Sequence, residues 1–101
     1  MKIINQPRSS GKTTELIKRC HERGGWIVCF SEGECVRVFR VAKDMGLKIA
    51  LPITFDRFLN AKYSYTRTPP VYIDYLDECL RQVSRNPIDT VTFTEEEKFN
   101  I

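Results

Sequence analysis

Apolar residues occur along the chain in two alternating patterns: short continuous runs, and stripes spaced three or four residues apart. A continuous apolar run bounded by turn residues is typical of a strand covered on both faces, whereas the wider spacing is typical of an amphipathic helix. The runs predict strands at residues 2–5, 26–30 and 71–74. The stripes predict helices at residues 12–23 and 32–45, and a third that begins near Leu76 and is terminated by Asn86-Pro87.

Turn and capping residues mark the ends of these helices. A glycine pair at residues 24–25 follows the first helix. Ser31 and Glu34 have the spacing of a capping box at the start of the second. A short helix, capped by Thr54 or Asp56, is predicted before the next loop.

Four further stretches carry weaker patterns. Residues 48–51 predict another strand, and residues 60–70, rich in Tyr, Thr and Pro, predict an exposed loop. Residues 88–94 alternate imperfectly between apolar and polar positions and predict a last strand. The glutamate-rich residues 95–101 predict a frayed acidic tail.

The alternation of strands and short crossover helices predicts an α/β fold. Such connections require a parallel sheet with helices on both faces, so we expect a three-layer sandwich with a sheet of four to five strands. A chain of 101 residues has room for one core, and we expect a single domain at residues 1–94 followed by the acidic tail. Open parallel sheets bind ligands beyond the carboxyl ends of their strands.

Composition excludes several classes of protein. No apolar run approaches the ~20 residues of a membrane span, and the N-terminus lacks the pattern of a signal peptide, so we expect a cytoplasmic protein without a membrane partner. The cysteines lack zinc-ligand spacing, and we expect buried thiols at Cys20, Cys29, Cys35 and Cys79. The net charge of +3 does not by itself indicate a nucleic-acid partner.

The strongest chemical signal is Gly11-Lys12-Thr13, between a predicted strand and a predicted helix. This context predicts a phosphate-binding (Walker A) loop, in which backbone N–H groups and the helix N-terminus hold an anion. Lys12 is expected to reach the β and γ phosphates of ATP, and the Thr13 hydroxyl to ligate Mg²⁺. The expected nucleotide-binding residues are Arg8, Ser9, Ser10, Gly11, Lys12, Thr13 and Thr14.

The loop departs from the full pattern G-x-x-x-x-G-K-[ST]. Gln6 stands where the first glycine is expected, and Ser9 stands where many such loops have another. A side chain in backbone that needs a positive φ costs about 1–2 kcal/mol. The loop is therefore a degenerate Walker A sequence, and we expect weakened nucleotide binding.

Asp74 ends the apolar run at residues 71–74, as the aspartate of a Walker B strand does. It is expected to bind Mg²⁺ together with Thr13 and to be catalytic with Lys12. Tyr75 stands where many ATPases place a glutamate that polarises the attacking water. Asp77, or less favourably Glu78, is the candidate to replace that glutamate. The alternative role for Asp74 is a helix N-cap, with Asp77 interacting with the helix dipole.

With these motifs, residues 1–94 resemble the first RecA-like domain of superfamily 1 helicases, reduced to its smallest form. Residues 9–14 resemble motif I, residues 54–58 the segment before motif II, and residues 91–94 motif III, while Asp74 is placed like the motif II aspartate. Similar small P-loop proteins occur in bacterial mobile elements and bacteriophages. The resemblance implies a RecA-like P-loop NTPase fold with ATP and Mg²⁺, but without the second domain that unwinding requires.

Three hypotheses of function follow. The first is nucleotide binding with weak or partner-stimulated ATP hydrolysis. The second is a non-catalytic interaction protein on a degenerate P-loop scaffold, such as a phage-encoded protein that targets a host factor. The third is nucleic-acid binding through Arg37, Arg40, Lys43 and the loop at residues 63–67, against which stands a solvated helix face and a flexible loop.

Overall fold

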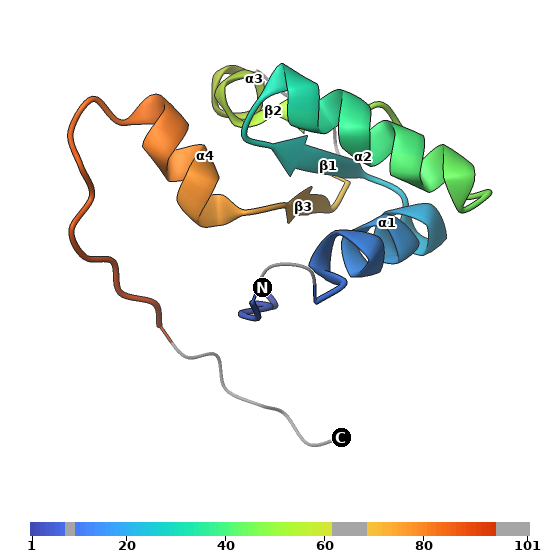
Figure 1. Ribbon diagram of the computed structural model, residues 1–101, viewed down its shortest axis with the longest axis horizontal. Coiled ribbons are helices and arrows are strands. Elements are labelled where there is room, and N and C mark those ends of the chain that lie inside the picture. The colour runs from blue at the N-terminus through green and yellow to red at the C-terminus, as the bar shows by residue number, and fades with distance from the viewer. Residues whose placement is uncertain (8–9, 62–68, 95–101) are drawn as a thin grey trace.

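The computed structural model describes residues 1–7, 10–61 and 69–94, and in these residues helices and strands alternate (Figure 1). The elements are α1 (Lys12–Arg23), β1 (Trp26–Cys29), α2 (Glu32–Asp44), β2 (Ile53–Thr54), α3 (Phe55–Asn60), β3 (Val71–Ile73) and α4 (Leu76–Val83). The predicted α/β class is confirmed. The predicted acidic tail and most of the loop before β3 lie outside the described residues.

The strands form a three-stranded parallel sheet with the order β2-β1-β3. In the register of the sheet Val28 is opposite both Ile53 of β2 and Ile73 of β3. The chain thus leaves the central strand toward one side and returns to the other. The crevice between the carboxyl ends of β1 and β3 is the switch point at which sheets of this kind bind ligands.

Alternate side chains of β1 enter two separate cores, one on each face of the sheet. Ile27 and Cys29 pack with buried residues of α1 and α2, whereas Val28 packs with Phe55 of α3 and Cys79 of α4. The period of two along a strand explains this division. Helices therefore cover both faces of the sheet, which places α1 and α2 in the same layer.

Several predicted helix boundaries are confirmed. The Ser31 hydroxyl accepts a hydrogen bond from the Glu34 N–H over 3.2 Å and caps α2. Of the two caps proposed for α3, Thr54 has this role: its hydroxyl accepts a bond of 3.4 Å from the Arg57 N–H. Gly24 follows α1, as its position after the last apolar residue of the stripe predicts.

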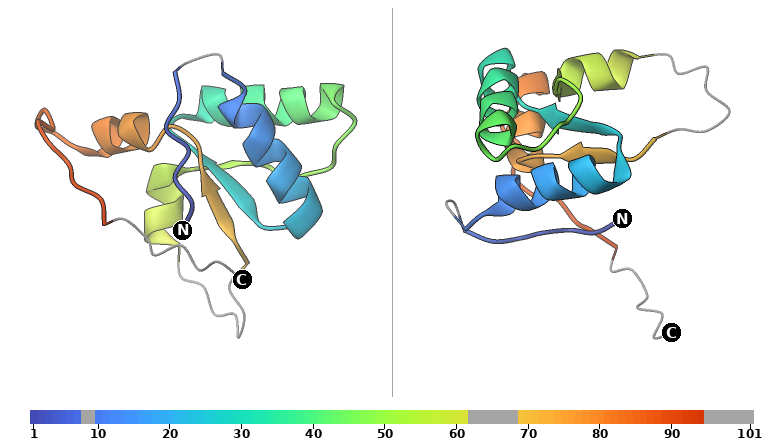
Figure 2. Two further views of the ribbon diagram at one scale, coloured as in Figure 1. Left: turned by 90° about the horizontal axis from the view of Figure 1, so that it is seen from below. Right: turned by 90° about the vertical axis from the view of Figure 1, so that its right-hand side faces the viewer.

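The strands predicted at residues 2–5, 48–51 and 88–94 are wrong: none of these segments is a strand. Ile3, Leu51 and Phe93 in these segments are at least half exposed, whereas Ile49 packs against the core beside α1 and α2. An apolar run stays in a sheet only when a neighbouring strand pairs its backbone and another layer covers its side chains. Lacking both, the last described residues leave α4 and run clear of the sheet (Figures 1 and 2).

Strand β2 lies later in the sequence than the strand predicted at residues 48–51. Pairing with β1 begins at Ile53, directly after Pro52, instead of within residues 48–51. Proline lacks an N–H for the ladder and is tolerated only at the start or edge of a strand. The sheet consequently has three strands in the described chain, not the four to five predicted. No described helix is both long and apolar enough to cross a membrane.

Candidate functional site

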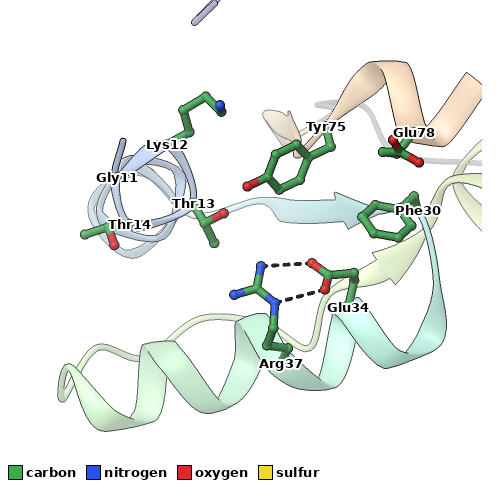
Figure 3. A pocket seen from close by; sticks show the side chains of 9 residues that line it. All are labelled: Gly11, Lys12, Thr13, Thr14, Phe30, Glu34, Arg37, Tyr75 and Glu78. Atoms are coloured by element: carbon green, nitrogen blue, oxygen red, sulfur yellow. Dashed lines mark hydrogen bonds and ion pairs between the residues drawn. The ribbon is translucent and has the colours of Figure 1, made fainter. Parts of the chain in front are cut away.

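A pocket of about 430 Å³ lies at the carboxyl ends of β1 and β3, between the first turns of α1, α2 and α4 (Figure 3). Its position at the switch point of the sheet is set by the topology described above. It is lined by Gly11, Lys12, Thr13, Thr14, Phe30, Glu34, Arg37, Tyr75 and Glu78.

The start of α1 supplies backbone donors to this pocket. Gly11, the N-cap, has φ +87°, a conformation that favours glycine, and it has no side chain with which to cap the helix. The first backbone bond of the helix runs from the Glu15 N–H to the Gly11 carbonyl over 3.0 Å. The N–H groups before Glu15 have no intrahelical acceptor, so this end of α1 presents donors to an anion.

Thr13 and Asp74 meet although they are 61 positions apart in the sequence. The Thr13 hydroxyl donates a hydrogen bond of 2.9 Å to Asp74 Oδ2. Asp74 is 3% exposed, and this burial raises the pKa of its carboxyl. The hydrogen bond from Thr13 and the charge of Arg37 act in the opposite direction. A buried carboxylate next to a hydroxyl is thereby placed at the start of α1.

Lys12 extends from the first turn of α1 back over the preceding loop. Its ammonium group donates to the carbonyl of Gln6 and, over 2.7 Å, to the carbonyl of Pro7. The same group lies over the ring of Tyr75. The positive charge is therefore held at the mouth of the loop that precedes α1.

Tyr75 connects β3 to α4 and forms one wall of the pocket. Its φ of 57° is the left-handed conformation, which is strained for a bulky side chain. Its ring meets that of Phe30 edge to face, with the centroids 6.3 Å apart. The ring therefore lines the pocket from the position directly after Asp74 in the sequence, where many ATPases have a glutamate.

The sequence favours Asp77 over Glu78 as the acidic residue at the site, whereas in the structure Glu78 lines the pocket and Asp77 does not. Asp77 does not line the pocket: its side chain is 62% exposed and lies 3.7 Å from Arg81. Glu78 does line it, and its carboxylate accepts a bond of 2.5 Å from Arg81. One position along a helix turns a side chain by about 100°, which decides which acid faces the site.

The remaining predicted loop residues divide by position. Thr14 lines the pocket together with Gly11, whereas Ser10 is exposed and donates to the Pro7 carbonyl over 2.6 Å. The predicted ligands Arg8 and Ser9 lie outside the described residues, as does the loop at residues 63–67 of the candidate nucleic-acid surface.

The sequence did not predict that Arg37 and Glu34 belong to this site. In the sequence, Arg37 belongs to the candidate nucleic-acid surface and Glu34 to a capping box. The two side chains form a double hydrogen bond, Nε to Oε1 and Nη2 to Oε2, both 2.9 Å (Figure 3). The available signal was positional: α2 follows the central strand, so its first turns lie beside the end of β3.

Within the described residues, no group of three or more His, Cys, Asp and Glu side chains gathers as a metal site. A phosphate-bound Mg²⁺ does not require one, because it uses one or two protein oxygens together with water and phosphate oxygens. The adjacent oxygens of Thr13 and Asp74 fit that requirement.

Comparison with known proteins identifies no relative. No family model matches the chain, and the searches of curated proteins and of solved structures also find no match. The resemblance to P-loop proteins therefore stays a prediction that rests on the residues of the site.

Proposed function

We propose that the chain binds a nucleoside triphosphate, with ATP the expected nucleotide, together with Mg²⁺. The observation that carries the proposal is the 2.9 Å hydrogen bond between Thr13 and Asp74 at the start of α1, where the N-cap is a glycine. A phosphate-binding lysine, a metal-binding hydroxyl and a metal-binding carboxylate are required together. Lys12, Thr13 and Asp74 supply them at one end of the sheet.

The anion would be bound by the backbone amides around Gly11 and by the Lys12 ammonium. The left-handed Gly11 turns the chain into the helix, and the helix dipole favours negative charge at that end. Lys12 already lies at the mouth of the loop, so it needs only to exchange the Gln6 and Pro7 carbonyls for phosphate oxygens. Such charge-assisted bonds are stronger than bonds to neutral carbonyls.

Mg²⁺ would be held by Thr13 and Asp74. Bound Mg²⁺ neutralises part of the phosphate charge and polarises the terminal phosphate. Burial of Asp74 in the absence of a cation is unfavourable for its ionised form. Metal binding would relieve this cost, which supports a resident cation at this end of the sheet.

Calorimetric titration with ATP, ADP and GTP, each with and without Mg²⁺, tests the proposal. We expect Mg²⁺-dependent binding that Lys12→Ala lowers by about 10-fold or more, since it removes charge-assisted bonds to phosphate. Lys18→Ala, an exposed change on the same helix, is the matched control and should bind as the wild type does. A wild-type chain that binds none of these nucleotides would contradict the proposal.

The alternative is a non-catalytic interaction protein on a degenerate P-loop scaffold, directed at a protein partner such as a host factor. One observation favours it: Lys12 is already bonded to the chain's own carbonyls, and one of these belongs to Gln6, which replaces the glycine of the motif. On this reading the lysine closes the loop and binds no ligand. The same titration separates the two functions, because a closed loop binds no nucleotide.

A further inference from the structure

Arg37 is a second cation in the pocket that contains Lys12, although the two residues come from different helices. Figure 3 shows its guanidinium group extending from α2 toward Thr13 and Tyr75. The sheet topology explains this placement, because α1 and α2 pack in the same layer and both begin at the end of the sheet where β3 ends. Arg37 therefore approaches the site from the side opposite the phosphate loop.

Arg37 lines the same pocket as Thr13, and its guanidinium faces Thr13 across that pocket (Figure 3). Arg37 is therefore placed to contact a ligand that the start of α1 binds. Lys12, held over the loop, occupies a different part of the pocket.

Glu34 holds Arg37 in this position through an ion pair that a competing anion can displace. The pair is bidentate, and the side chains of Arg37 and Glu34 are 48% and 20% exposed. Solvent screens ion pairs of this kind, so they contribute little to stability. The planar guanidinium that now fits a carboxylate fits two phosphate oxygens equally well.

The geometry points to Arg37 as the residue that contacts the terminal phosphate of a bound triphosphate. Before a triphosphate binds, Glu34 pairs with the guanidinium; this inference rests on the proposed nucleotide function. The loop amides and Lys12 bind the phosphates near α1, and the metal lies at Thr13 and Asp74. Arg37, beyond that pair, meets the phosphate that a triphosphate has and a diphosphate lacks. The chain thereby supplies within one domain a cation that larger enzymes take from a second domain or a partner.

The experiment compares ATP and ADP affinity, with Mg²⁺, in the wild type, Arg37→Gln, Glu34→Gln and Arg40→Gln. We expect Arg37→Gln to weaken ATP binding by about 10- to 100-fold and ADP binding by less than about twofold, because only ATP loses a charged contact. Glu34→Gln should strengthen ATP binding, since it releases the guanidinium. Arg40→Gln, an exposed change on the same helix, should leave both affinities unchanged.

The outcomes separate this inference from the function on which it rests. Equal effects of Arg37→Gln on ATP and ADP, or no effect on either, would overturn the role of Arg37 while the chain remains a nucleotide-binding protein. A wild type that binds neither nucleotide overturns both. Thermal unfolding checks the variants, and because the Arg37 side chain is half exposed we expect its replacement to leave Tm unchanged within about 2 °C.

Discussion

The ammonium group of Lys12 lies 5.4 Å from the centroid of the Tyr75 ring, so a side chain shortly after β3 reaches the lysine at the start of α1. A cation over an aromatic face at a partly exposed site is stabilised by about 0.5–1 kcal/mol. The contact joins two features that are far apart in the sequence, the degenerate loop and the tyrosine in the position of a glutamate.

We expect the isolated chain to hydrolyse ATP at well below ~1 s⁻¹, the lower end of ordinary enzyme turnover. Tyr75 occupies the place of a water-orienting carboxylate, and the nearby Arg37 is bonded to Glu34. Phosphate-release kinetics measure the rate. Tyr75→Glu should raise turnover by about 10-fold or more, as a positioned general base does. Tyr75→Gln, equal in size but without the charge, is its control.

Turnover of the wild type near or above ~1 s⁻¹ would show that another residue orients the water. A turnover per molecule of protein that rises with protein concentration would indicate that a second copy of the chain supplies the missing group. Equal rates for the Tyr75→Glu and Tyr75→Gln variants would remove the carboxylate from the explanation.

Asp74→Asn should stabilise the ligand-free chain while weakening Mg²⁺-dependent nucleotide binding. Burial raises the folded-state pKa of Asp74 above its ordinary value of 3.8, so its ionised form destabilises the fold at neutral pH. The amide can still accept the Thr13 hydrogen bond. We expect a gain on the order of 1 kcal/mol in the free energy of unfolding at pH 7, typical of relieving strain at a functional site.

The sign of the pH dependence follows from the same shift. The folded chain binds the Asp74 proton more tightly than the unfolded chain, so the penalty fades as the pH falls through the folded pKa toward 3.8. Urea unfolding at several pH values should show the variant's advantage largest at neutral pH and smallest in acid. Asp77→Asn, at an exposed position, is the matched control. An advantage that is independent of pH would assign it to packing.

The cysteines should resist thiol reagents in the folded protein. All four are buried, and burial raises the pKa of Cys79 to about 11 and raises the pKa of each of the others. Both effects suppress the thiolate that reacts. At pH 8 we expect that no thiol of the native protein is labelled fast, whereas all four are labelled fast in urea. Mass spectrometry measures the number of labels. A Lys18→Cys variant, exposed on α1, should label at once and shows that the reagent is active.

The apolar residues of the last described segment should contribute little to stability. Ile88, Val91 and Phe93 are 43%, 53% and 57% exposed. Replacing all three with serine should change the free energy of unfolding by less than about 1 kcal/mol, as is usual for surface positions. Val38→Ala, in the core between α1 and α2, should by itself cost about 1–3 kcal/mol. A large loss in the triple variant would mean that this segment pairs with the sheet in solution.

The features that the sequence determined by itself are local. The glycine that turns the chain into α1, the serine and threonine caps of α2 and α3, and the apolar spacing of α4 each depend on interactions within a few residues. The pairing of Gly11-Lys12-Thr13 with a buried carboxylate after an apolar run was also readable, because parallel strands end at the same edge. Asp74 lies where that pattern predicts.

Tertiary structure decided which apolar runs became strands and which charges entered the site. Residues 2–5 and 88–94 have the composition of strands but find no partner in the described chain, since strand formation depends on pairing and burial more than on composition. Arg37 and Glu78 face the pocket, whereas Asp77 does not, because α2 and α4 pack with one particular side against the sheet. Sequence spacing specifies the faces of a helix, and only packing selects the face that meets the site.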